Sequence, residues 1–120
     1  MARIGSKSFD SPDEVRKLDW GMGEIELVNI DSGMVGRATF QPGWRWSEHV
    51  KPIVGTESCQ VAHAGYQVSG RMGVRMDDGE EMEFAPGDVM RIPPGHDGWV
   101  IGDEPSVMID WEGMTDYATP

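Results

Sequence analysis

Hydrophobic and polar residues alternate along most of this chain, which is the pattern of β-strands that bury one face and expose the other. The segment 24–31 alternates in this way, and Met72, Val74 and Met76 alternate with arginine and glycine. Short turn sequences separate these runs, namely Ser32-Gly33, Pro42-Gly43, Asp78-Gly79, Pro86-Gly87 and Pro93-Pro94-Gly95. About eight or nine short strands at this spacing predict an all-β protein, either a sandwich or a barrel.

The N-terminal segment has a different pattern. Ser11-Pro12-Asp13-Glu14 resembles the start of a helix, with Ser11 as the N-cap, Pro12 at the first helical position and Glu14 reaching back to the cap. The sequence therefore predicts one short N-terminal helix that ends near Trp20-Gly21.

Three further segments carry weaker signals. The segment 44–50 is expected to be another extended piece, and the segment 51–58 is expected to be irregular because it contains proline and glycine. The last residues, 115–120, are expected to form a loose tail. Since the length suits one domain and no repeat or linker interrupts the chain, residues 1–120 are expected to fold as a single domain.

Composition and charge narrow the range of partners. The chain has 16 glycines and 8 prolines, which suits many turns. Its formal net charge of −11 argues against nucleic acid and against anionic membrane surfaces, because both attract clustered lysine and arginine. No apolar run approaches the roughly 20 residues that span a bilayer. The single cysteine excludes an internal disulfide framework, and a cytoplasmic location is expected.

One part of the chain has a more specific signature. Gly70 closes a turn, and Gly87, Pro93 and Gly95 follow the frame G-x5-P-x-G. In this frame the chain resembles the cupin superfamily over about residues 43–111. The resemblance implies a double-stranded β-helix, also called a jelly-roll barrel, with a central pocket in which many members hold a divalent metal through three histidines and one glutamate. Because cupins often pair through edge strands, a homodimer is expected.

The metal-ligand positions that the resemblance implies are filled by other residue types. The spacing of the first cupin motif places Glu57 and Cys59 at its two histidine positions and His63 at its glutamate position. The third histidine position falls on Gly98, and His96 lies two residues before it. None of the four positions keeps the residue that is usual in the family.

Glu57, Cys59, His63 and His96 are nevertheless all able to bind metals. The first three share parity, so on one extended strand their side chains face the same way. We therefore expect them to hold one divalent transition metal, which is Zn, Fe, Ni, Mn or Cu rather than Mg or Ca. Simpler roles compete: a small buried hydrophobe for Cys59, a hydrogen-bonded pocket histidine for His63, a loop cap for His96 and a solvated acid for Glu57.

Aromatic residues and one further histidine are candidates for a substrate pocket. Trp44 and Trp46 share a strand face, which indicates either core packing or a platform for a flat or apolar ligand. Tyr66 is expected to direct its hydroxyl into the pocket or to pack. A second register of the first cupin motif starts at Gly43 and places His49 at the mouth of the barrel; the alternative for His49 is a surface position.

Two functions are compatible with these residues. The first is a metal-dependent enzyme of the oxygenase or isomerase type that acts on a small organic molecule. The second is a non-catalytic sensor or regulatory module that binds a small molecule or a metal. The cupin resemblance by itself names neither the substrate nor the reaction.

Overall fold

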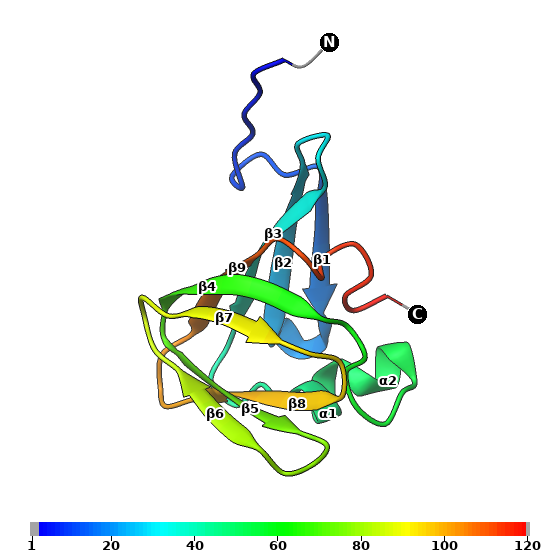
Figure 1. Cartoon of the computed structure of the whole chain (residues 1–120), viewed down its shortest axis with the longest axis vertical. Helices are drawn as coiled ribbons and strands as arrows, with labels where there is room; N and C mark the ends of the chain where they lie inside the picture. Colours follow the sequence, from blue (N-terminus) through cyan, green and yellow to red (C-terminus); the bar gives the residue numbers. More distant parts are fainter. Residues whose placement is uncertain (1–2, 120) are drawn as a thin grey trace.

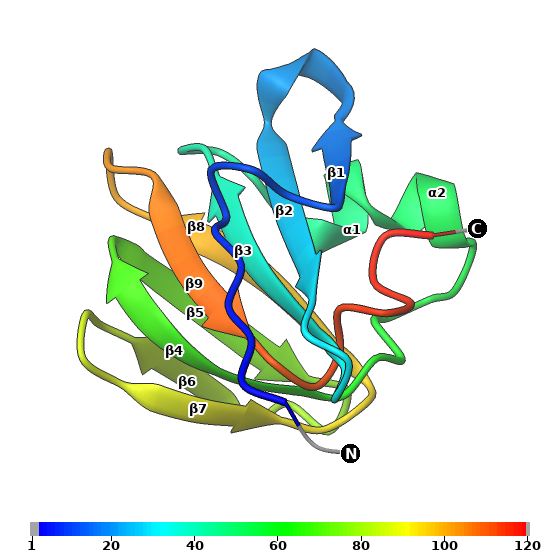
Figure 2. The same ribbon diagram turned by 90° about the horizontal axis from the view of Figure 1, so that it is seen from above.

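A computed structural model describes residues 3–119 as two antiparallel β-sheets on opposite sides of one core (Figures 1 and 2). The larger sheet has six strands in the order β1-β2-β3-β9-β4-β7, and the smaller has three in the order β6-β5-β8. The strands are β1 (Glu14–Leu18), β2 (Gly23–Asn29), β3 (Met34–Phe40), β4 (His63–Ser69), β5 (Arg71–Met76), β6 (Glu81–Phe84), β7 (Val89–Ile92), β8 (His96–Ile101) and β9 (Ser106–Asp110). The predicted all-β architecture is confirmed.

The alternating pattern of the sequence corresponds to inward and outward positions on these strands. On β8 and β9 buried and half-buried residues alternate strictly along the strand. The buried core draws on both sheets and includes Ile25, Leu27, Phe40, Met72 and Val74. β9 also turns the polar residues Ser106 and Asp110 inward beside Met108, so the core contains polar groups that need partners.

Two short helices replace the extended and irregular segments predicted between β3 and β4. They are α1 (Trp46–His49) and α2 (Lys51–Val54). The first helix starts where the carboxylate of Asp97, on β8, accepts a hydrogen bond of 3.0 Å from the backbone N–H of Ser47. This cap comes from 50 residues along the chain, so local sequence does not reveal it.

No helix among the described residues is long and apolar enough to cross a membrane.

The prediction of an N-terminal helix is wrong. Residues 14–18 form β1, which pairs antiparallel with β2 along its whole length. Asp13 does not serve a helix start; its carboxylate accepts a 2.7 Å hydrogen bond from the backbone N–H of Asn29. The free edge of β2 offers a row of unpaired backbone groups, and pairing with it satisfies more of them than one isolated helical turn does.

The C-terminal segment is also not the loose tail that the sequence predicts. Met114 and Tyr117 are 2% and 4% exposed, respectively, and both belong to the core. In Figures 1 and 2 this red segment lies beside α2 and against the body of the protein. Its docking depends on Asp110, which directly precedes it at the end of β9, and on Arg16 of β1, which is about 100 residues away in sequence. Pro120 lies outside the described residues.

Gly70 provides a test of the turn between β4 and β5. Its φ is +67°, and a Cβ at this position would lie 2.1 Å from the backbone oxygen of Pro105. Gly70→Ala is therefore expected to lower the free energy of unfolding by about 2–3 kcal/mol, through left-handed strain and a backbone clash. Gly79→Ala is the matched control. The φ of Gly79 is +97° but the space around it is open, so a loss of about 1 kcal/mol in the free energy of unfolding is expected. Urea denaturation measures both; equal losses would contradict the clash.

Candidate metal centre

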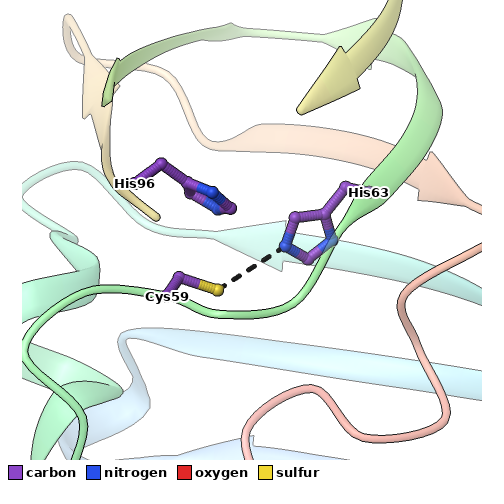
Figure 3. Close-up of side chains that lie close together, drawn as sticks. All are labelled: Cys59, His63 and His96. Carbon is purple, nitrogen blue, oxygen red and sulfur yellow. Dashed lines mark hydrogen bonds between the residues drawn. The ribbon is translucent and has the colours of Figure 1, made fainter. Parts of the chain in front are cut away.

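Cys59, His63 and His96 converge in the interior of the protein (Figure 3). One ligand atom from each lies within 4.8 Å of the others, and the Cys59 Sγ is 3.7 Å from Nε2 of His63. All three side chains are buried, with exposed fractions of 2–5%. Three soft or intermediate donors therefore face one small volume, an arrangement that suits a transition metal.

Backbone pairing brings the three residues together from two sheets. His63 is the first residue of β4 in the larger sheet, and His96 is the first residue of β8 in the smaller sheet. Cys59 precedes β4 and forms an isolated antiparallel bridge with His96. In that bridge the backbone N–H of Cys59 donates to the carbonyl of His96 at 2.7 Å. The bridge thus fixes the thiol opposite the imidazole.

Both histidines are oriented by acceptors on their far side. Nδ1 of His63 is 2.5 Å from Oδ2 of Asp110, and Nδ1 of His96 is 2.8 Å from the carbonyl oxygen of Pro93. A carbonyl or carboxylate oxygen only accepts, so Nδ1 carries the proton in each ring. When the rings are neutral, Nε2 then has a free lone pair, which is the state that a metal ligand needs.

The charges of this group are strongly coupled. Burial alone raises the pKa of the Cys59 thiol, but hydrogen bonds with His63 and His96 stabilise the thiolate and lower this pKa to about 6. Burial lowers the pKa of His63, whereas its bond to the Asp110 carboxylate and the nearby thiol raise it to about 9. Burial raises the pKa of Asp110, but the His63 contact outweighs it and lowers this pKa below its ordinary value.

Glu57 is separated from the other predicted ligands. Its side chain is 98% exposed and pairs with Lys51 at 3.1 Å. It is not part of the Cys59, His63 and His96 group among the described residues. The shared parity of residues 57 and 59 did not bring Glu57 inward, because the segment before β4 is not a continuous strand.

The four predicted pocket residues divide into two pairs. Trp44 and Trp46 are each 2% exposed and line an inner cavity that His63 and His96 also line. His49 lies on α1, where its Nδ1 is 3.1 Å from the backbone N and O of Arg45 at the start of the same helix. Tyr66 faces outward from β4 and is 39% exposed. Neither His49 nor Tyr66 lines the cavity.

The inner cavity is small and mostly apolar. About 30 Å³ is open to the centre of a water molecule, which is room for roughly one or two waters. Phe40 stacks on Trp44 with ring centroids 3.9 Å apart, and Met114 and Tyr117 close the cavity from the C-terminal segment. Gly98, at the third histidine position of the family motif, also lines it. Nε1 of Trp44 is buried and has no hydrogen-bond partner among the described residues.

Sequence reasoning missed Asp110, Met114 and Tyr117. Asp110 is fully buried, and its second oxygen accepts hydrogen bonds from the backbone N–H groups of Glu112 and Gly113 at 2.9 and 3.1 Å. One signal was available: Asp110 shares parity with Met108 on a strand whose alternate residues face inward. Met114 and Tyr117 have no comparable periodic signal, because they lie in an irregular segment.

Comparison with known proteins identifies the fold. No family model and no curated protein matches this chain. A sugar phosphate isomerase of the cupin superfamily from Silicibacter pomeroyi matches 88% of this chain and 73% of its own, with a TM-score of 0.61 and 17% identity. KdgF from Halomonas sp. matches 89% and 91%, with a TM-score of 0.60 and 21% identity. Oxalate decarboxylase from Lactobacillus farciminis matches 84% and 32%, with a TM-score of 0.58 and 20% identity. The chain has the cupin fold.

Proposed function

We propose that this cupin-fold protein binds one divalent transition metal through Cys59, His63 and His96 and uses it to act on a small organic molecule. The observation that supports the proposal most directly is the orientation of the two histidines. Each is held by an acceptor at Nδ1, so that its Nε2 is the atom left for a metal beside a buried thiol.

The dimensions of the group fit one metal ion. In tetrahedral zinc sites the Zn–S and Zn–N distances place a sulfur and a nitrogen ligand roughly 3.5 Å apart. The Cys59 Sγ and the His63 Nε2 are 3.7 Å apart, and the donor atoms of all three residues lie within 4.8 Å of one another. A set of one thiolate and two imidazoles suits Zn, Fe, Ni or Cu more than Mg or Ca, with Mn as a further candidate.

Three protein ligands are the number found in catalytic metal sites that keep a position open for water or substrate. A metal held there would polarise an oxygen atom of the bound molecule. The chain's own residues supply the rest of the site. Asp110 orients His63, and the walls formed by Phe40 and Met114 keep bulk water out.

A sensor without turnover is the second candidate, and the size of the cavity favours it. About 30 Å³ does not accommodate a whole organic substrate in the closed structure. The enzyme proposal therefore requires that part of the wall moves. Two cupin-fold neighbours are a sugar phosphate isomerase and an oxalate decarboxylase, and their names support the enzyme as the first candidate.

Metal content and thermal stability test the proposal. Protein purified without an affinity tag is expected to contain close to one transition-metal ion per chain by mass spectrometry of the elements. After chelation, at least one of Zn, Fe, Ni, Mn and Cu is expected to raise the melting temperature by roughly 10 °C when it is present at about 100 times its dissociation constant. Metal-free protein that none of the five ions stabilises would refute the proposal.

A further inference from the structure

A groove on the protein surface lies directly outside the candidate metal centre. It has a volume of about 300 Å³ and runs between α2, the segment 56–61 and the C-terminal segment, which lie side by side in Figures 1 and 2. Away from the metal centre it is lined chiefly by Val54, Thr56, Gln60, Val61, Asp116 and Thr119. This volume is at the lower end of the range for small-molecule sites.

One wall separates the groove from the inner cavity. Trp46 and Tyr117 line both spaces. Cys59 lines the groove, whereas His63 and His96 line the cavity. The three candidate ligands therefore lie at the boundary between the two spaces, and a movement of Tyr117 would connect them.

Tyr117 is held in this wall by contacts on both sides. Its ring packs edge-on against His63, with centroids 5.3 Å apart. On the other side Arg16, which comes from β1, donates hydrogen bonds to three backbone carbonyls of the C-terminal segment. The acceptors are Met114 at 2.9 Å, Thr115 at 3.1 Å and Tyr117 at 2.6 Å. A single guanidinium thus fastens the segment that carries Tyr117.

We propose that this groove is the entrance and outer binding site of the metal centre, and that the segment 113–119 is a gate that Arg16 holds closed. The inference deepens the proposed function, on which it rests, by giving the route and the chemical class of the ligand. With Tyr117 displaced, the groove and the cavity form one site: the groove holds the body of the ligand and the cavity receives its reacting group.

The lining of the groove indicates a small molecule without negative charge. Asp116 is the one charged residue among those that line it, and the chain carries a formal net charge of −11. Val54 and Val61 suit an apolar portion, while Thr56 and Gln60 offer hydrogen bonds. An anionic ligand would meet a carboxylate in the groove and a negative field around it, whereas a neutral or cationic ligand meets neither obstacle.

Cys59 serves as a native probe of this route, because it is the single cysteine and it lines the groove. In metal-free protein its rate of labelling can be compared for two methanethiosulfonate reagents of similar size, one with a trimethylammonium group and one with a sulfonate. The cationic reagent is expected to react roughly threefold to tenfold faster, after correction for the rates with a small free thiol. Asp116→Asn is expected to reduce this ratio.

Substitutions of Arg16, whose hydrogen bonds hold the segment 113–119 in place, test the gate itself. Arg16→Gln is expected to speed labelling by both reagents roughly tenfold or more, since three charge-assisted hydrogen bonds are lost. Arg16→Lys keeps the charge without the planar fork, so an intermediate rate is expected. Arg71→Gln is the matched control, because Arg71 pairs with Glu83 on β6, away from the groove, and its loss is expected to change nothing. Circular dichroism and urea denaturation confirm that each variant is folded, and Tyr117→Ala serves in place of Arg16→Gln if that variant is not.

The outcomes separate this inference from the proposed function. Two results together support the entrance, even if no metal binds. Labelling of Cys59 is faster in Arg16→Gln or Tyr117→Ala, and the preference for the cationic reagent depends on Asp116. Unchanged labelling in folded Arg16→Gln and Tyr117→Ala overturns the gate, even if metal analysis finds an ion. A preference for the anionic reagent overturns the assignment of the ligand class.

Discussion

Replacing His96 with alanine is expected to weaken metal binding by more than about 100-fold, because it removes one of the three proposed donors. Loss of an outer-shell partner alone costs roughly 10-fold to 100-fold in metal affinity, and loss of a direct ligand costs more. His63→Ala is expected to have an effect of the same order. Competition with a chelator of known affinity measures both.

Two further variants identify the donor set. Cys59→Ser is expected to abolish the thiolate-to-metal charge-transfer absorption of the cobalt-substituted protein, which a change in packing alone would not remove. Glu57→Gln is the control: its side chain is 98% exposed and pairs only with Lys51 among the described residues, so unchanged affinity is expected. If Glu57→Gln weakens binding as strongly as His96→Ala does, the site has been assigned to the wrong residues.

Replacing Asp110 with asparagine is expected to lower the free energy of unfolding by about 3–5 kcal/mol, the largest loss of stability among the substitutions considered. Asp110 is fully buried, pairs with His63 at 2.5 Å and caps the N–H groups of Glu112 and Gly113. Asparagine leaves the buried imidazole without its charge partner, and breaking a buried ion pair costs this order of free energy. The same substitution is expected to lower metal affinity roughly 10-fold to 100-fold, because His63 loses its orienting acceptor.

The pH dependence of this loss follows from the two pKa shifts in metal-free protein. The pKa of His63 is raised from 6.5 to about 9. Protonated His63 therefore stabilises the folded state fully below pH 6.5, and this stabilisation is lost as the pH rises through 9. The pKa of Asp110 is lowered, so its contribution is present above its ordinary value of 3.8 and is lost as the pH falls below it. The difference between wild type and Asp110→Asn is therefore expected to be largest between about pH 4 and 6.5 and to shrink toward pH 9.

Urea denaturation at several pH values measures this profile. Asp103→Asn is the matched control, since Asp103 is exposed and forms no ion pair or side-chain hydrogen bond among residues 3–119; a loss near zero is expected at every pH. A loss for Asp110→Asn that is constant between pH 5 and 9 would show that Asp110 acts only as a cap for the C-terminal segment.

Much of the architecture was predictable from local sequence. Period-two alternation identified most of the strands, and the frame of Gly87, Pro93 and Gly95 identified the cupin resemblance. Both glycines have a left-handed φ, +99° and +92°, which glycine adopts without strain. The N-terminal helix was wrong because a local capping pattern competed with an open strand edge on β2, and strand pairing is a non-local contact.

The candidate site was predictable in part. The motif spacing pointed to Glu57, Cys59 and His63, and the choice of metal-capable residue types added His96. Strand parity also favoured Glu57, but the segment that carries it is not a strand, and its side chain lies outside the group. Asp110 was missed because its role appears only when β9 lies beside β4, which pairs Gly65 with Asp110.

The sequence by itself determined where most of the strands and turns lie and which residue types are able to bind a metal. Only the tertiary structure decided that Cys59 and His96 form a backbone bridge, that Asp110 orients His63, and that Arg16 fastens the C-terminal segment over the cavity. The reason is physical. Turn preference and alternation act between neighbours in the chain, whereas these contacts join residues 37–101 positions apart, and their positions are set by strand register and packing.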